Sequence, residues 1–363
     1  MRTMKVLVLT RYGRLGASSR LRFLQYLPAL NEDGIEFDVR PFFSDEMLQK
    51  KYKKGSYSLI GIFHAYAQRI KILRHRNNFN LVWIEKEALP WVPAWVEKTL
   101  LSGVSYVQDF DDAWFHNYDL HRSNFVRRIL GQRLDKLMAG AQLVVGGNNY
   151  LVDRAVAAGA AWTEKVPTVI DLERYPAVPK NNVAGVLPTI VWIGSPSTVR
   201  YLRELAVPLA ALAKKVPFKL RVIGAHLALD GVEVECLPWL EESEVAAIAA
   251  CDIGVMPLID SPWERGKCGY KLIQYMACHL PVVASPVGVN KDIVEEGRNG
   301  FLAERPQDWI DALSQLLTQP ELRQRMGQEG RHRVETTYCL QVTGPVLANL
   351  LIKAARGSSS HGQ

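Results

Sequence analysis

The sequence predicts an α/β protein made of two doubly wound, Rossmann-like domains. Hydrophobic runs typical of buried strands alternate with amphipathic helical stretches. A strand, a small-residue loop and a helix open the chain, and the same pattern starts again near residue 189. At 363 residues the chain is too long for one compact core. With 48% hydrophobic and 22% charged residues, its composition is that of a globular protein and excludes a disordered or fibrous chain.

The first domain is expected to begin with a buried strand at residues 5–10. A loop with Gly13 and Gly16 follows, and a helix rich in large apolar residues comes after Arg20. Because this loop is Gly-x-x-Gly without a third glycine, it is not the dinucleotide fingerprint, and we do not expect an NAD site. Further strands are predicted at residues 37–40, 81–84, 105–108 and 143–146.

The second domain is expected to follow residues 176–182, which have the composition of a linker. Its first strand, residues 189–194, leads into a loop where Ser195 or Ser197 can cap a helix that starts at Tyr201. Later strands are predicted at residues 218–224, 232–236, 253–257 and 281–284. We therefore predict domains at 1–172 and 173–341, a helix at 342–356 that can cross back onto the first domain, and a disordered tail at 357–363.

Positive charge is concentrated in the first half of the chain. The net charge is +7 overall, but residues 1–170 hold 24 Lys and Arg against 16 Asp and Glu. Residues 49–76 hold eight basic residues and no acid, interleaved with apolar side chains. This pattern fits an amphipathic segment on an anionic membrane, and it equally fits a core helix with a solvated basic rim. No nucleic-acid-binding motif accompanies the charge, so we expect no nucleic acid partner.

The chain shows no sign of a membrane span, a disulfide framework or a metal site. No run reaches the roughly 18 apolar residues that cross a bilayer. The apolar run at residues 6–9 ends before Arg11 and is interpreted as a strand, not a signal peptide. Five cysteines without paired spacing predict a reduced, cytoplasmic protein with no zinc motif.

Residues 257–302 carry the strongest functional pattern. At their centre a loop ending in Gly269 is expected to open a helix, with Lys267 and Lys271 on its first turn. Free backbone N–H groups, the helix dipole and two lysines make such a place attractive to a diphosphate. The alternative is that Gly269 only relieves crowding while both lysines point into water.

Two motifs in this stretch resemble those of glycosyltransferase family 4. They are Met-Ala-Cys-His-Leu-Pro-Val-Val-Ala-Ser at residues 276–285 and Asp-Ile-Val-Glu-Glu-Gly-Arg-Asn-Gly-Phe-Leu at residues 292–302. The resemblance covers nearly the whole chain. It implies the GT-B fold, in which two Rossmann-like domains face each other across a cleft. It also implies a first domain that binds the acceptor, a second that binds a nucleoside-diphosphate sugar, retention of anomeric configuration, and no required cofactor or metal.

The chain departs from the family pattern at both glutamates of the loop. The family's sugar-binding Glu falls on Gly266 and its ribose-binding Glu on Gln274, whose amide can still hydrogen-bond a hydroxyl. Glu264 lies two residues early and would need a remodelled loop. The loop resembles the Gly-Lys-x-x-x-Lys version of capsule and O-antigen transferases. Glu264, Gly266 and Cys268 are therefore the candidates for contact with the donor sugar.

The resemblance also assigns roles to other residues. The candidates for donor and diphosphate binding are Gly16, Ser195, Ser197, Thr198, Arg200, Lys267, Gly269, Tyr270, Lys271 and Gln274. Candidates for acceptor binding are Ser18, Ser19, Arg20, Arg22 and Lys86. Trp239 falls where the family contacts the base.

Acidic residues follow two of the predicted strands, where ligands of parallel sheets bind. Glu85, Lys86 and Glu87 follow one strand, and residues 109–112, Asp-Phe-Asp-Asp, follow the next. Asp109 and Asp111 match the Asp-x-Asp of metal-dependent transferases, but the two-domain pattern favours polar contact with the sugar or acceptor. A helix N-cap explains one of the aspartates. The catalytic candidates are Asp111, Asp112, His116 and Lys271.

The sequence thus predicts a metal-independent glycosyltransferase that uses a nucleotide-sugar donor and a lipid-linked or glycan acceptor in cell-surface polysaccharide synthesis. It is expected in the cytoplasm, with the 49–76 segment able to dock on the inner face of the membrane. Two alternatives remain open: a GT-B-fold nucleotide-sugar epimerase or hydrolase, and a sugar-binding protein that has lost catalysis.

Overall fold

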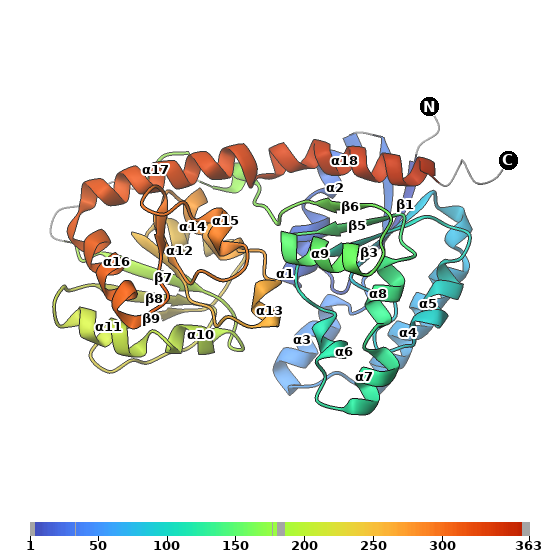
Figure 1. Ribbon diagram of the computed structural model, residues 1–363, viewed down its shortest axis with the longest axis horizontal. Helices are drawn as coiled ribbons and strands as arrows, with labels where there is room; N and C mark the ends of the chain where they lie inside the picture. Colours follow the sequence, from blue (N-terminus) through green and yellow to red (C-terminus); the bar gives the residue numbers. More distant parts are fainter. Residues whose placement is uncertain (1–3, 33, 176, 180–185, 358–363) are drawn as a thin grey trace. The chain divides into compact units, whose positions relative to one another are not determined.

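The computed structural model describes residues 4–32, 34–175, 177–179 and 186–357 (Figure 1). The chain divides into two compact units. Unit 1 comprises Met1–Thr168, Gly266–Cys268 and Thr343–Gln363, and unit 2 comprises Val169–Arg265 and Gly269–Val342. The division falls four residues before the predicted one. Parts of two predicted segments, residues 176 and 180–182 of the linker and residues 358–363 of the tail, lie outside the described residues.

Unit 1 is built on a six-stranded parallel sheet with the order β2-β1-β3-β4-β5-β6. Its strands are β1 (Met4–Leu9), β2 (Ile35–Val39), β3 (Leu81–Glu85), β4 (Tyr106–Phe110), β5 (Leu143–Gly146) and β6 (Thr163–Lys165). Its helices are α1 (Ala17–Ser19), α2 (Leu27–Glu32), α3 (Asp45–Lys54), α4 (Leu59–Arg74), α5 (Ala94–Leu101), α6 (His116–Asp119), α7 (Asn124–Leu130), α8 (Arg133–Met138) and α9 (Asn149–Ala157), with a π-helical turn at Arg20–Leu24 and a 3-10 turn at Arg76–Asn78.

Unit 2 repeats this plan with the strand order β12-β11-β10-β7-β8-β9, again all parallel. Its strands are β7 (Thr189–Ile193), β8 (Lys219–Ile223), β9 (Glu233–Leu237), β10 (Ile253–Met256), β11 (Val282–Ala284) and β12 (Gly300–Leu302). Its helices are α10 (Val199–Arg203), α11 (Ala206–Ala213), α12 (Glu244–Ala249), α13 (Pro262–Arg265), α14 (Tyr270–Ala277), α15 (Asn290–Ile293), α16 (Pro306–Thr318) and α17 (Pro320–Thr337), with a 3-10 turn at Leu172–Arg174.

The two sheets confirm the predicted fold class of two Rossmann-like α/β domains. Continuous apolar strands form the centre of each unit, as expected for parallel sheets covered on both faces (Figure 1). Every residue of β3 and β7 is buried. The short strands β6 and β12 were not predicted, because three residues give too little periodicity to detect.

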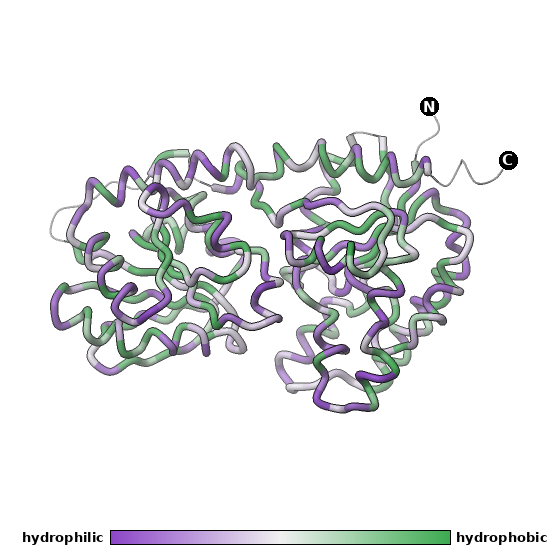
Figure 2. Tube along the Cα trace, in the orientation of Figure 1, coloured by the Kyte–Doolittle hydropathy of each residue, from purple (hydrophilic) through white to green (hydrophobic). Residues whose placement is uncertain are grey.

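Helix α18 (Leu340–Arg356) begins in unit 2, and its residues from Thr343 onward belong to unit 1. There the hydroxyl of Thr343 lies 2.9 Å from that of Tyr26. Hydrophobic residues are more frequent along α18 than along α17 (Figure 2). Among the described residues, no helix is both long and apolar enough to cross a membrane.

Residues 49–76 form parts of two helices instead of one continuous amphipathic segment. Helix α3 ends at Gly55, whose φ of 78° is left-handed, and α4 starts at Leu59. A left-handed glycine is the usual end of a helix, because it costs no Cβ clash. The basic residues of the segment are therefore divided between α3, α4 and the 3-10 turn that begins at Arg76.

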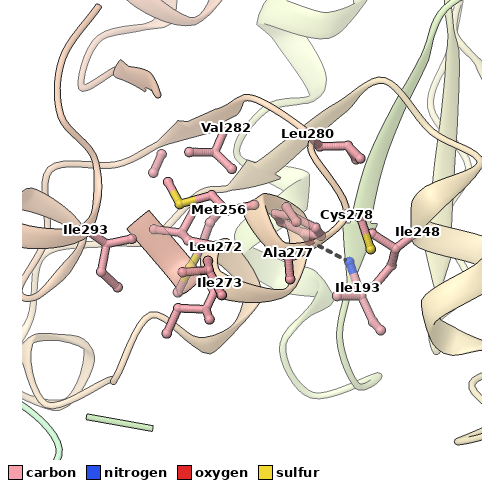
Figure 3. Packing of buried hydrophobic residues seen from close by; sticks show 14 of the residues in the cluster. Ile193, Ile248, Met256, Leu272, Ile273, Ala277, Cys278, Leu280, Val282 and Ile293 are labelled. Carbon is pink, nitrogen blue, oxygen red and sulfur yellow. Dashed lines mark hydrogen bonds between the residues drawn. The ribbon is translucent and has the colours of Figure 1, made fainter. Parts of the chain in front are cut away.

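Helix α14 is the centre of the core of unit 2. Leu272, Ile273 and Ala277 pack among side chains from β10, β11 and α15 (Figure 3). The Tyr275 hydroxyl accepts a hydrogen bond from the Ile193 N–H at 3.0 Å, which connects α14 to β7. Gly269 precedes the helix with φ 65°, and a Cβ there would lie 2.3 Å from Ile293 Cδ1.

Replacing Gly269 by Ala should destabilise unit 2 by about 2–4 kcal/mol, from left-handed strain and overpacking together. Gly297→Ala is the matched control, because Gly297 has a similar φ of 73° but no described atom within 4 Å of the added Cβ. The control should lose only the unfolding free energy that left-handed backbone strain costs, about 1–2 kcal/mol. Urea unfolding followed by circular dichroism measures both, and equal losses would contradict the packing shown at α14.

Candidate active site

The carboxyl ends of β3 and β4 carry a cluster of buried charges in unit 1. Glu85 and Asp109 are paired in the register of these neighbouring strands and are buried, as are Lys86 and Glu87. The carboxyl edge of a parallel sheet is the ordinary ligand-binding position in doubly wound folds. The structure thus brings the two predicted acidic clusters together.

Lys86 neutralises two carboxylates of this cluster. Its Nζ lies 2.8 Å from Asp111 Oδ1 and 3.2 Å from Asp112 Oδ2, and only 3% of the residue is exposed. Burial alone would lower the pKa of Lys86, but the two carboxylates raise it above its ordinary value. Lys86 also has φ 61°, a left-handed conformation that costs energy in a residue with a Cβ. These ion pairs hold the backbone in that conformation.

The two aspartates differ in their proton affinity. Burial acts to raise the pKa of Asp111, but Lys86 outweighs it and the pKa lies below its ordinary value. Burial raises the pKa of Asp112 above its ordinary value, although Lys86 opposes the shift. The two side chains are 17% and 25% exposed, so a ligand at this edge can reach them. Asp112 is therefore the better proton acceptor of the pair.

Asp109 is held by Arg22. Arg22 donates from Nε at 2.9 Å and from Nη2 at 2.5 Å to Asp109 Oδ1, and from Nη1 at 2.6 Å to the Val166 carbonyl. Burial raises the pKa of Asp109 to about 6, although Arg22 lowers it. Each carboxylate of Asp109 and Asp111 therefore faces its own cation. Within the described ranges, no three His, Cys, Asp or Glu side chains gather as a metal ligand set.

Four of the predicted acceptor residues, Lys86, Arg22 and the two serines, lie at the charged edge. Ser18 and Ser19 donate to Glu85 at 2.7 and 2.6 Å. Arg20, like Arg22, is buried, and its Nη1 donates to the Arg14 carbonyl at 3.0 Å.

Gly16 is required where it stands, because a Cβ there would lie 2.3 Å from Tyr12 Cβ. It precedes α1 with an extended backbone. In the predicted glycine loop of unit 1, Gly16 therefore lies against the side chain of Tyr12.

His116 is fully engaged by protein partners. Its Nδ1 lies 2.7 Å from Asp119 Oδ1, and its Nε2 lies 2.8 Å from the Tyr150 hydroxyl. A histidine with both ring nitrogens bonded has no lone pair or proton left for a substrate. The candidate catalytic residues of unit 1 are therefore the two aspartates.

Sequence reasoning missed a second buried network beside this edge. Glu87 accepts from Tyr118 at 2.7 Å and from Trp114 Nε1 at 2.7 Å, and lies 3.0 Å from Arg133 Nη1. Arg133 also pairs with Glu97 at 2.6 Å. These partners are far apart in the sequence, so no spacing of motifs indicates them.

The loop Gly266–Cys268 belongs to unit 1, which the sequence did not predict. A Cβ on Gly266 would lie 2.5 Å from Ala113 Cβ, so the larger side chain of the family's glutamate does not fit there. Asn148 Nδ2 donates to the Lys267 carbonyl at 2.9 Å, and the Cys268 thiol donates to the Asp111 carbonyl at 3.1 Å. Burial raises the pKa of Cys268 to about 12, so the thiol is neutral.

The prediction that Lys267 stands on the first turn of the helix is wrong, because α14 begins at Tyr270. Lys271 is on that turn. Its Nζ lies 4.9 Å from the ring centroid of Trp192, on β7. Its positive charge therefore lies by a buried aromatic face near the carboxyl end of β7.

Glu264 has protein partners in unit 2. It accepts from the hydroxyls of Tyr201 and Ser261, and Arg200 Nη2 lies 3.5 Å from its carboxylate. The side chain of Arg200 is 65% exposed, while Glu264 is buried. Glu264 thus positions Tyr201 and Arg200, and Arg200 still presents charge to solvent.

The loop after β7 differs from its predicted form. Helix α10 starts at Val199, not at Tyr201, and neither Ser195 nor Ser197 caps it by a described side-chain hydrogen bond. Ser195 and Ser197 are exposed with their hydroxyls 2.8 Å apart, and Thr198 Oγ1 donates to the Ser195 carbonyl at 3.0 Å. With five residues, α10 is too short for a developed helix dipole.

Two further predicted donor residues lie on α14. Gln274 is buried, and its Nε2 donates to the Tyr175 hydroxyl at 3.4 Å. Tyr270 is half-buried at the start of the helix.

A cavity of about 490 Å³ lies at the carboxyl ends of β8 and β9. It is lined by Gly224, Ala225, His226, Cys236, Leu237, Pro238 and Trp239. Trp239 Nε1 donates to Glu244 at 2.7 Å, which fixes the indole. An indole beside a hollow of this kind suits a planar ring.

Comparison with known proteins identifies the region that holds these unit 2 residues. Residues 187–319 match the family model described as Glycosyl transferases group 1. The chain has the GT-B fold, and this region is similar to group 1 glycosyl transferases. In sequence it is 31% identical over 132 residues to D-inositol 3-phosphate glycosyltransferase of Pseudarthrobacter chlorophenolicus, which is 36% of this chain and 30% of that protein.

Solved structures match the fold of this chain almost from end to end. Sucrose-phosphate synthase from Thermosynechococcus elongatus aligns with a TM-score of 0.69 at 14% identity, over 96% of this chain and 98% of that one. Anabaena HepE in complex with UDP-glucose aligns with a TM-score of 0.67 at 16% identity, over 96% and 100%. The sequence matches span only 17% to 36% of the curated relatives.

Replacing Lys86 by Met should destabilise unit 1 by about 3–5 kcal/mol, because Asp111 and Asp112 would keep buried charges without a cation. Burial would then raise the pKa of both carboxyls, so the folded variant would bind protons that the unfolded chain has released. Its stability should therefore fall as pH rises above about 4. Urea midpoints at several pH values measure this. Lys98→Met, at an exposed lysine of α5, is the control, and equal midpoints for the two variants would contradict the role of Lys86.

Proposed function

We propose that the chain is a glycosyltransferase of the family 4 type that moves a sugar from a nucleoside-diphosphate sugar to an acceptor. The observation that supports it most is the placement of Lys271 by Trp192 and Arg200 by Glu264, within the region that matches group 1 glycosyltransferases. Both cations belong to elements at the carboxyl end of β7. Structural neighbours such as HepE are complexes with UDP or UDP-glucose, so UDP-sugars are the first donors to test.

In this proposal unit 2 binds the donor. The cavity beside Trp239 accepts the base, and Lys271, Arg200 and the N-terminus of α14 bind the diphosphate. Lys267, four residues before Lys271 in the chain, belongs to unit 1 and is proposed as a further cation. The exposed hydroxyls of Ser195 and Ser197 supply neutral donors to phosphate oxygens.

The proposed reaction breaks the bond between the anomeric carbon and the diphosphate oxygen, and forms a bond from that carbon to the acceptor oxygen on the same face. The leaving diphosphate gains negative charge, which the cations stabilise more in the transition state than in the ground state. The acceptor hydroxyl loses its proton to Asp112 or to the departing phosphate. Lys86 acts as a positioning residue for Asp112.

Changing Lys271 or Lys267 to Ala should remove about 2–4 kcal/mol of transition-state stabilisation and lower kcat/KM accordingly, while the fold stays intact. Lys291→Ala is the control, because Lys291 is an exposed lysine elsewhere in unit 2. Initial rates of transfer with a UDP-sugar donor measure the effect. Normal rates for both variants would remove these lysines from the mechanism.

Turnover should not require a divalent ion, because lysine and arginine already supply positive charge to the leaving group and Asp109 and Asp111 face Arg22 and Lys86. Initial rates in a chelator should match those in magnesium or manganese. If activity vanished in chelator and returned with the metal, a metal-held diphosphate would replace this account.

We propose that the acceptor is lipid-linked, in surface-polysaccharide synthesis, and that unit 1 docks on the inner face of the cytoplasmic membrane to meet it. Tyr52, Leu59, Ile60 and Phe63 are between 73% and 82% exposed on α3 and α4. The exposed lysines of α3, Lys50, Lys53 and Lys54, flank Tyr52 and precede Leu59 in the sequence. Large apolar side chains beside lysines are the composition of a surface that enters an anionic membrane interface.

Reversing Lys53 and Lys54 to Glu should weaken binding to acidic liposomes, since each cation near such a surface contributes about 1 kcal/mol. Lys214 and Lys215, an exposed pair in unit 2, give the matched double reversal. Sedimentation with acidic and neutral liposomes measures both. If the two double variants lost liposome binding equally, or if the wild type did not bind, α3 would be interpreted as a solvated helix face.

A further inference from the structure

A groove in unit 1 lies by the carboxyl end of β2, and its lining includes none of the residues of the charge cluster at β3 and β4. Its volume is about 890 Å³, and α4 forms one wall. The other wall comes from the chain after β2 and the start of α3. The lining residues are Val39, Arg40, Pro41, Phe42, Ser44, Glu46, Met47, Ile60, Gly61, His64, Ala65, Gln68, Arg69, Lys71, Ile72 and His75.

Arg69 lines this groove with a buried charge that lacks an anionic partner. Only 3% of the residue is exposed. Its Nη2 donates to the carbonyls of Thr10 and Arg40, both at 2.9 Å, while Nη1 has no hydrogen-bond partner among the described residues. None of the ion pairs of the described chain includes Arg69. Burial lowers the pKa of Arg69 to about 10, offset only in part by Glu97 and Glu85, so the guanidinium is still charged at neutral pH.

The rest of the groove favours an anion attached to an apolar body. Lys71 adds positive charge, Arg40 is paired with Asp38 at 2.7 Å, and Glu46 is the single acid of the lining. Met47, Ile60 and Ile72 provide apolar surface on both walls. Ile60 is 82% exposed and connects the groove to the apolar surface of Leu59 and Phe63. A buried guanidinium pairs best with a phosphate or carboxylate that it can bind through two N–H groups.

We propose that this groove binds the phosphate of a membrane lipid, with the phosphate on Arg69 and the acyl chain along Ile60, Met47 and Ile72. The site is separate from the donor site of unit 2. It depends on the proposed membrane docking only for the way in which the lipid reaches it. Bound lipid would supply the negative charge that Arg69 lacks and would orient unit 1 on the membrane.

Dihexanoyl phosphatidic acid, kept below its micelle concentration, tests the site without a bilayer. Isothermal titration should show one bound molecule per chain. Inorganic phosphate, which lacks the acyl chains, and dihexanoyl phosphatidylcholine, whose net charge is zero, should each bind at least ten-fold more weakly. Absence of binding by phosphatidic acid, or equal binding by either comparator, would overturn the assignment.

Two variants locate the ligand. Arg69→Met should weaken the binding of phosphatidic acid at least ten-fold, which is the size of the effect of losing a charge-assisted hydrogen bond. Because Arg69 also bonds two carbonyls, Gln68→Glu serves as a second variant: Gln68 is an exposed residue of the lining, and a carboxylate there should repel the phosphate. Arg128→Met, on exposed α7, removes the same charge elsewhere and should bind normally. Unchanged binding in Gln68→Glu, or equal loss in Arg128→Met, would contradict the site.

The lysine-reversal variant of α3 separates this inference from membrane docking. This variant should no longer bind acidic liposomes but should still bind the short-chain lipid, because Lys53 and Lys54 do not line the groove. Loss of the short-chain lipid in that variant would show general electrostatic attraction in place of a built site.

Discussion

The ion pairs of Lys86 with Asp111 and Asp112 are the interaction on which the functional edge of unit 1 depends. They join the ends of β3 and β4, and they hold Lys86 in a left-handed conformation that it would not otherwise adopt. Removing a buried charge from water is costly, so such a cluster persists only when each charge is matched. Among the described residues Asp109 faces Arg22, and Asp111 and Asp112 share Lys86.

In the loop before α14, glycine stands where the family pattern has a glutamate. Gly266 lies against Ala113, and Gly269 takes the left-handed conformation before the helix. Glycine is needed at the first for space and at the second for both space and φ. Lys267 and Lys271 therefore bracket a segment whose conformation is fixed by packing.

The sequence alone predicted the features that depend on local pattern. Apolar runs located most strands of both sheets, and the turn at Gly269 placed Lys271 at the start of a helix. It could not predict contacts between distant residues. The partners of His116, the pairing of Arg22 with Asp109 and the burial of Arg69 all depend on side chains brought together by the fold. The start of α10 was misplaced by two residues, because Ser195 and Ser197 both look like caps.

Nucleotide binding by unit 2 is the central claim, and the thermal unfolding of the chain in nucleoside diphosphates tests it most directly. A specific ligand stabilises in proportion to the logarithm of its concentration over Kd. UDP or another nucleoside diphosphate should raise the unfolding temperature of the wild type in this way, with a much smaller rise for Lys271→Ala. If no nucleoside diphosphate or nucleotide sugar shifted the unfolding temperature of the wild type at millimolar concentration, the central claim would be contradicted.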